Sequence, residues 1–81
     1  MSKQFLSALG QNVKNRRLQK QWTQLELCYA AGVDLSYISR IERGQVNVSI
    51  EALLKVSIAL DCDARDLLPE NSVADADDTE K

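Results

Sequence analysis

Apolar residues recur along most of the chain at the three- and four-residue spacing of an amphipathic helix, and no segment alternates strictly between apolar and polar positions. One apolar stripe near the start consists of Leu6, Leu9 and Val13, and a later one consists of Leu53, Leu54, Val56 and Leu60. We interpret both as core-facing stripes. The pattern predicts five helices, at roughly residues 4–20, 24–31, 35–42, 50–60 and 64–68, and therefore an all-α fold.

Short polar residues mark the starts of the last four predicted helices. Each follows an apolar residue, as an N-cap does after a hydrophobic N′ position; they are Thr23, Asp34, Ser49 and Asp63. Five residues after each N′ position stands another large apolar residue, which is the spacing of a hydrophobic staple; these are Leu27, Ile38, Leu53 and Leu67. Thr23 and Glu26 also have the spacing of a capping box, so we expect helices to begin at these points.

The segment from Gln24 to Arg43 contains two short predicted helices separated by a turn centred on Gly32. Glycine adopts positive φ without steric cost, so Gly32 can reverse the chain in one residue, and Gly44 is expected to end the second of these helices. Apolar residues on the facing sides are expected to hold the two helices together; they are Leu27, Ala31, Val33, Ile38 and Ile41. The segment therefore has the pattern of a helix-turn-helix.

The formal charge of −2 is unevenly distributed along the 81 residues. Residues 1–60 carry eight Lys and Arg against four acids, a net charge of +4, whereas residues 61–81 carry two bases against eight acids, a net charge of −6. A basic body with an acidic end is typical of a nucleic-acid-binding domain whose positive face is local. We expect one domain over residues 1–69 and a disordered acidic tail over residues 70–81.

Several function classes find no support in the residues. No apolar stretch reaches the length of a membrane span or a signal peptide, so we expect a cytoplasmic protein with no membrane partner. The chain has no His, and Cys28 and Cys62 stand in unrelated contexts, so we expect packing cysteines and no metal. With no nucleophile beside a base and no phosphate-binding glycine loop, we expect no enzyme, no cofactor and no small-molecule ligand.

Several runs together resemble the helix-turn-helix family of phage repressors and Cro-like proteins, also called the XRE family. The resemblance covers roughly residues 9–68 and rests on WTQLEL, AAGVD, SYISRIERG, the polar loop ending in Ser49, and EALLKVSIAL. It implies a compact five-helix, lambda-repressor-like fold, with the helix-turn-helix in the second and third helices, that binds double-stranded DNA. The short chain and the run RIERGQVNVSIEALLKVSIAL most resemble the controller proteins of restriction–modification systems.

This resemblance implies a transcriptional regulator that acts as a homodimer on an inverted-repeat operator, with RNA polymerase as a candidate partner. A phage or plasmid repressor and a host regulator of the same family are the alternatives. A protein-interaction module or antitoxin is an alternative from a different class, and the basic Arg40 and Arg43 argue against it. The residues leave the operator sequence and the choice between activation and repression open.

The resemblance also assigns roles to individual residues. The helix at residues 35–42 is expected in the major groove, where base edges would be contacted by Leu35, Ser36, Ser39 and Arg40. Arg40 suits the O6 and N7 atoms of guanine, and Leu35 suits a thymine methyl group. Contacts to phosphate are expected from Thr23, Gln24, Tyr37, Arg43, Gln45, Asn47 and Ser49.

Two further expectations concern the framework around that helix. By the resemblance, Arg17 and Glu42 form a partly buried structural ion pair; the alternative is two independent surface charges. A single recognition helix contacts few base pairs, so useful specificity needs a second copy of the chain. The dimer interface is expected at Ile58, Leu60, Leu67 and Leu68, unless these residues complete the core of one chain.

Overall fold

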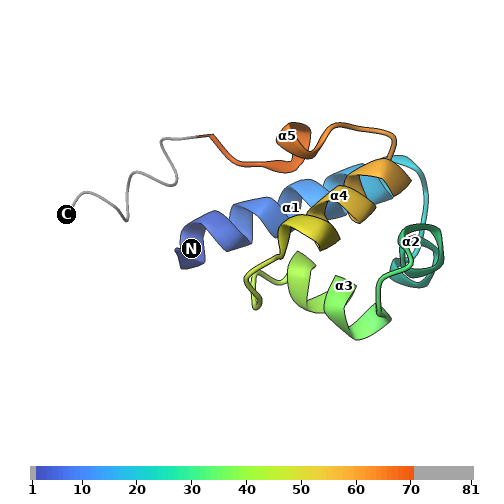
Figure 1. The fold of residues 1–81 in the computed structure, drawn as a ribbon, viewed down its shortest axis with the longest axis horizontal. Helices are drawn as coiled ribbons and strands as arrows, with labels where there is room; N and C mark the ends of the chain where they lie inside the picture. The colour runs from blue at the N-terminus through green and yellow to red at the C-terminus, as the bar shows by residue number, and fades with distance from the viewer. Residues whose placement is uncertain (1, 71–81) are drawn as a thin grey trace.

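The computed structural model describes residues 2–70, and most of the acidic tail expected at residues 70–81 lies outside them. Within this range the chain forms five helices and no strand: α1 (Lys3–Gln19), α2 (Gln24–Ala31), α3 (Leu35–Glu42), α4 (Ile50–Ala59) and α5 (Ala64–Leu67). Every boundary lies within one residue of the predicted one. The all-α, five-helix fold is therefore confirmed (Figure 1).

Polar side chains begin the helices largely as the sequence predicts. Thr23 Oγ1 accepts a hydrogen bond from the Glu26 amide at 3.1 Å, and the Glu26 carboxylate accepts one from the Thr23 amide at 2.7 Å, which completes the capping box. Ser49 Oγ accepts from the Ala52 amide at 3.1 Å. Asp34 occupies the N-cap position of α3 but makes no side-chain capping hydrogen bond. Ser2 is a further cap, which was not predicted: its hydroxyl oxygen accepts a hydrogen bond from the Phe5 amide at 3.0 Å at the start of α1.

One core is built from all five helices. The four staple residues are buried within it, namely Leu27, Ile38, Leu53 and Leu67, and the stripe of α1 joins them through Leu9 and Val13. Leu54 is 48% exposed, so its predicted place in the core is wrong. Successive residues of a helix are rotated by about 100°, and α4 turns Leu53 and Val56 inward, which leaves Leu54 on the outer side.

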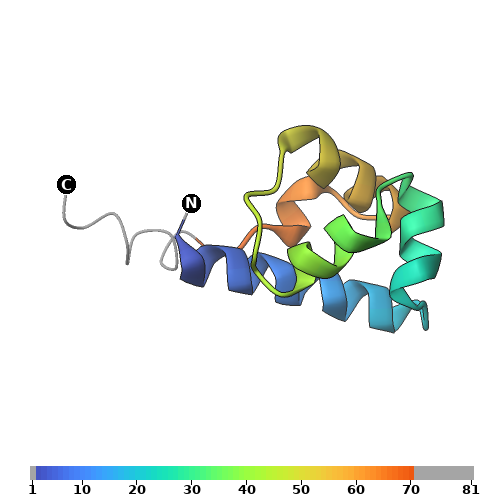
Figure 2. The same ribbon diagram turned by 90° about the horizontal axis from the view of Figure 1, so that it is seen from below.

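The helices are arranged so that α3 lies at the surface. In Figure 1, α1 and α4 occupy the middle of the molecule, with α5 above them and α3 below. Figure 2, seen from below, shows α3 in front with α1 and α4 on either side and α2 crossing at its end. α3 therefore occupies the side of the molecule away from α5, and α2 lies at one end of the molecule.

The contact between α1 and α3 depends on Gly10. A Cβ atom added there would lie 2.8 Å from the Glu42 carbonyl oxygen and closer still to that of Ile41. Real Cβ atoms do not approach backbone at such distances. The missing side chain therefore lets the two helix backbones pack directly against each other.

Both cysteines are free thiols that are half-buried and packed against the core. Burial raises the pKa of the Cys62 thiol, an effect that nearby Arg16 opposes. In the described part of the chain, no helix is both long and apolar enough to cross a membrane, and no cluster of three potential metal ligands occurs.

Candidate nucleic-acid interface

The turn between α2 and α3 connects the two helices of the helix-turn-helix. Gly32 has a φ of 68° and ends α2 in the left-handed region, and its amide donates to the Cys28 carbonyl oxygen at 2.9 Å. The Val33 amide donates to the same oxygen at 3.3 Å. Residues with a Cβ atom rarely adopt this conformation, so Gly32 sets the direction in which α3 leaves the turn.

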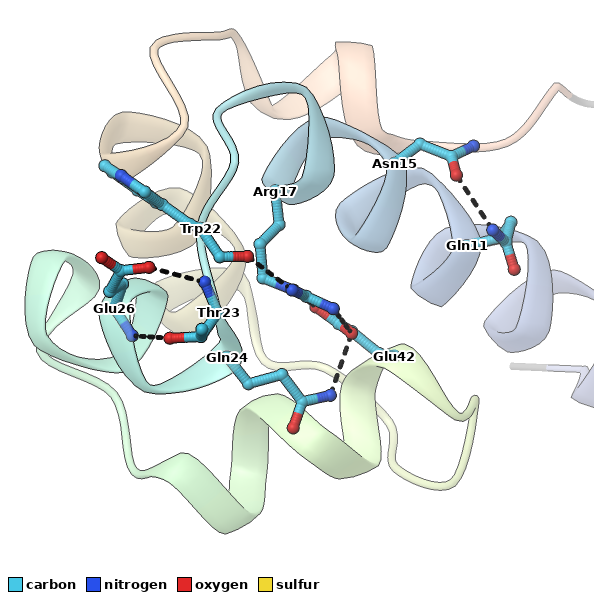
Figure 3. A network of polar contacts seen from close by, with 8 residues as sticks. All are labelled: Gln11, Asn15, Arg17, Trp22, Thr23, Gln24, Glu26 and Glu42. Atoms are coloured by element: carbon cyan, nitrogen blue, oxygen red, sulfur yellow. Dashed lines mark hydrogen bonds and ion pairs between the residues drawn. The ribbon is translucent and has the colours of Figure 1, made fainter.

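A buried ion pair fixes α3 against the other helices (Figure 3). Arg17 Nε donates to Glu42 Oε2 at 2.7 Å, and Arg17 Nη2 donates to Glu42 Oε1 at 3.0 Å. The side chains of Arg17 and Glu42 are only 8% and 3% exposed. The expected structural ion pair is therefore confirmed, and the alternative of two surface charges is wrong.

Two further hydrogen bonds extend the ion pair into the start of α2. Arg17 Nη1 donates to the Trp22 carbonyl oxygen at 2.7 Å, and Gln24 Nε2 donates to Glu42 Oε1 at 3.0 Å. The pair thereby connects α1, the α1–α2 loop, α2 and the end of α3 (Figure 3). Gln24, which was predicted only as a phosphate contact, is therefore also part of this network.

The four candidate base contacts lie on α3, where Ile38 and Ile41 face the core. Leu35, Ser36 and Arg40 are exposed, and Ser39 is half-buried. Leu35, at the first position of α3, is 42% exposed and is not part of the core. The arrangement leaves these side chains free to contact a ligand laid along α3, and their contact with bases stays a prediction.

The candidate phosphate contacts gather in two places. Thr23 and Gln24 stand at the start of α2, whereas most of the others lie in the α3–α4 loop, namely Arg43, Gln45, Asn47 and Ser49. Figure 2 shows this loop to the left of α3 and α2 to its right. Arg43 Nε donates to Gln45 Oε1 at 3.1 Å, and Asn47 is exposed. Two polar sites therefore border α3, as the two sugar–phosphate strands border the major groove.

Tyr37 is placed differently from the other candidates. Its hydroxyl oxygen accepts a hydrogen bond from the Ser49 amide at 3.2 Å, which connects α3 to the start of α4. Its ring packs against the core, and the Arg40 guanidinium carbon lies 5.9 Å from the ring centre. The spacing of three residues between Tyr37 and Arg40 along a helix is the signal that could have revealed this contact.

The expected dimer interface divides into two kinds of residue. Leu60 and Leu67 are 3% and 0% exposed and belong to the core of one chain, so assigning them to an interface is wrong. Ile58 and Leu68 are 73% and 42% exposed. The reason is that α4 and α5 pack against each other and enclose Leu60 and Leu67 between them and α1. Of the expected interface residues, Ile58 and Leu68 therefore remain at the surface, and Leu54, one turn before Ile58, is also exposed.

Known proteins share both the sequence pattern and the fold. The family model described as helix-turn-helix matches residues 13–67. The HTH-type transcriptional regulator SinR of Bacillus subtilis is 43% identical over 70 residues, which are 85% of this chain and 63% of SinR. The chain therefore spans less than two thirds of that relative's length.

Two restriction–modification proteins are also similar. The control protein C.BamHI of Bacillus amyloliquefaciens is 36% identical over 69 residues, covering 84% of this chain and 85% of that protein. The crystal structure of the restriction–modification controller protein C.AhdI from Aeromonas hydrophila matches with a TM-score of 0.76 and 40% identity, over 78% of this chain and 96% of that one. These similarities confirm the resemblance found in the sequence.

Proposed function

Since the helix-turn-helix model matches residues 13–67, the chain belongs to the helix-turn-helix family, and from this premise we propose that it binds double-stranded DNA sequence-specifically and regulates transcription as a homodimer. The observation that carries the proposal is the setting of α3. Its outer side presents Leu35, Ser36 and Arg40, and the buried pair of Arg17 and Glu42 fixes it against the rest of the domain. A rigidly supported helix with exposed donors suits the major groove.

Within the groove, the proposed contacts follow from the chemistry of each side chain. Arg40 donates two hydrogen bonds to O6 and N7 of a guanine, and Leu35 packs on a thymine methyl group. Ser36 and Ser39 have hydroxyl groups that both donate and accept, so they discriminate less between bases. Sequence preference therefore depends most on Arg40.

Phosphate contacts hold α3 in register on the duplex. The hydroxyls of Thr23 and Ser49 already cap their helices, so free backbone amides at the starts of α2 and α4 are the donors offered to phosphate. Arg43, Gln45 and Asn47 add side-chain donors in the α3–α4 loop. Gln24 contributes through the amide hydrogen that its bond to Glu42 leaves free.

A second copy of the chain completes the operator complex. We assign the contact between copies to Ile58 and Leu68, extended by Leu54, because these apolar side chains remain exposed, by 73%, 42% and 48%. A two-fold dimer places its two recognition helices on half-sites about 34 Å apart, and its operator is then an inverted repeat.

The similarity to C.BamHI and C.AhdI supports the role of a restriction–modification controller, and the similarity to SinR supports the alternative of another regulator of the same family. In either role the protein acts in the cytoplasm by binding rather than by catalysis, without a cofactor, and RNA polymerase is the proposed partner at a promoter.

The proposal is tested by selecting bound duplexes from a random DNA pool and titrating the enriched sequence at two salt concentrations. We expect an inverted repeat. Arg40→Ala should lower affinity by about 1 to 3 kcal/mol and remove the preference at one base pair of each half-site. Arg43→Ala should weaken binding to all sequences alike and reduce the salt dependence. Failure to enrich any sequence would contradict the proposal and favour a protein-interaction module.

A further inference from the structure

Arg40 lies near an aromatic ring and is paired with no acid among the described residues. Its guanidinium carbon lies 5.9 Å from the centre of the Tyr37 ring. Over residues 2–70 it donates no side-chain hydrogen bond and forms no ion pair, in contrast to Arg17, which is bound to Glu42. A ring face attracts the positive charge without occupying any N–H group, so all five donors of Arg40 remain available.

Tyr37 is itself held in place from two sides. Its half-buried ring packs against the hydrophobic core, and its hydroxyl oxygen accepts a hydrogen bond from the Ser49 amide at 3.2 Å. Ser49 is the N-cap of α4, and its own hydroxyl is bonded to the Ala52 amide. The ring is therefore part of the rigid framework, although it stands on the helix that presents Arg40.

We infer that Tyr37 is a specificity-determining positioning residue, which restricts Arg40 to the orientations that reach a base edge. The inference rests on the proposed function, since it takes Arg40 as the residue that contacts a base. A free arginine loses rotamer freedom when it binds, whereas one already attracted to a fixed ring loses less. Tyr37 thereby contributes to sequence discrimination without touching the base.

Arg43, three residues after Arg40, has a different setting, which suits a different contact with DNA. Arg43 Nε donates to Gln45 Oε1 at 3.1 Å in an exposed loop, and no ring lies against its guanidinium group among the described residues. One of its donors is already used, and its position follows a surface loop. This setting suits a contact to phosphate, which needs charge more than fixed orientation.

The experiment measures how strongly the 81-residue chain discriminates between two operators. Dissociation constants are determined on the selected operator and on an operator in which the base pair assigned to Arg40 is replaced, and their ratio is the discrimination. The variants are Arg40→Ala, Tyr37→Leu, Tyr37→Phe and the double variant of Tyr37→Leu with Arg40→Ala. Tyr29→Leu on α2 is the matched control, because that tyrosine is exposed and contacts neither Arg40 nor Ser49 in the described structure.

We expect the wild type to discriminate by about five- to 150-fold and Arg40→Ala to abolish the difference. Tyr37→Leu should remove most of the discrimination, and adding it to Arg40→Ala should cause no further loss of discrimination. Tyr37→Phe keeps the ring and should keep the discrimination, with any loss of affinity equal on both operators. Partial unfolding of a variant lowers binding to both operators equally, so the ratio reports positioning and not stability.

Three results would overturn the inference. If Tyr37→Leu retains full discrimination while Arg40→Ala abolishes it, Tyr37 does not position Arg40, and the proposed function stands. If Tyr37→Phe loses as much discrimination as Tyr37→Leu, the ring is not the group that holds Arg40. If Arg40→Ala retains full discrimination, the assignment of Arg40 to a base is wrong, and the inference falls with it.

Discussion

At the scale of single residues, the same kind of interaction has very different consequences inside and outside the core. Arg17 and Glu42 are almost fully buried, and their hydrogen bonds connect α1, α2 and α3. Lys55 and Glu51 also form an ion pair, 3.5 Å apart, but both side chains are exposed on α4. Burial decides which of the two pairs the fold depends on, because water competes for the exposed charges.

Glu42→Gln is expected to lower the free energy of unfolding by about 3 kcal/mol, because the variant leaves the Arg17 guanidinium buried without a counter-charge. Urea denaturation followed by circular dichroism measures the loss. Glu51→Gln is the matched control and should change stability by less than about 0.5 kcal/mol. Equal effects of the two substitutions would contradict the structural role of the buried pair.

Gly10→Ala is expected to destabilise the protein, although replacing glycine by alanine inside a helix usually stabilises it. Alanine favours a helix interior over glycine by about 1 kcal/mol. Here the added Cβ atom would lie within 3 Å of the Glu42 carbonyl oxygen, so α1 and α3 must separate. We expect a net destabilisation of about 1 to 3 kcal/mol by urea denaturation. Lys14→Ala, on the exposed side of α1, should have little effect, and a stabilised Gly10→Ala variant would show that the helices are not in direct contact.

At the scale of elements, the ends of the helices are determined by local chemistry. Gly32 ends α2 in the left-handed region, as glycine commonly does. Gln21, just after α1, adopts a similar φ of 61° although it has a Cβ atom. The start of α2 follows only three residues later, so the chain must turn sharply at Gln21, and this turn holds a residue with a Cβ atom in a strained conformation.

Gln21→Gly is expected to stabilise the protein by about 0.5 to 1 kcal/mol, because glycine adopts positive φ without the steric penalty of a Cβ atom. The change is read from the midpoint of thermal or urea unfolding. Gln19→Gly lies two residues earlier, at the last residue of α1, and should destabilise by up to about 1 kcal/mol. Replacement of Gln by Gly is thus expected to raise stability at one site and to lower it at the other. A loss of stability in Gln21→Gly would show that the backbone of Gln21 is not strained.

At the scale of the whole molecule, the helices enclose most large apolar side chains but leave some on the outer side of α4 and after α5. Ile58 and Leu68 are the expected interface residues that remain at the surface, whereas Leu60 and Leu67 complete the core. A small domain has little interior in which to bury apolar groups, so association with a second copy is a direct way to cover those that remain.

Ile58→Glu should shift the protein from dimer to monomer, because a charge at the contact would have to be buried on association. Analytical ultracentrifugation over a range of concentrations measures the shift. Tyr29→Glu, at an equally exposed position on α2, is the control and should leave the dimer intact. Leu60→Ala should instead destabilise each chain by about 2 to 5 kcal/mol. If Ile58→Glu leaves the dimer unaffected, the proposed interface at Ile58 is wrong.

The sequence by itself determined the helices and the pattern of the helix-turn-helix. Caps such as Thr23 and Ser49, the turn glycine and the staple residues act within a few positions of one another, so their effect is visible in a short stretch of chain. The pairing of Arg17 with Glu42 came from resemblance to a family, because a contact between residues 25 positions apart leaves no local signal.

Only the tertiary structure decided which apolar residues remain exposed and how the polar side chains of the interface are held. Leu54 and Leu60 both belong to the predicted stripe of α4, but the neighbours of that helix bury one and leave the other in solvent. The hydrogen bond between the Ser49 amide and the Tyr37 hydroxyl likewise required the angle between α3 and α4. Helix periodicity defines a face, whereas the packing of helices against one another defines what that face contacts.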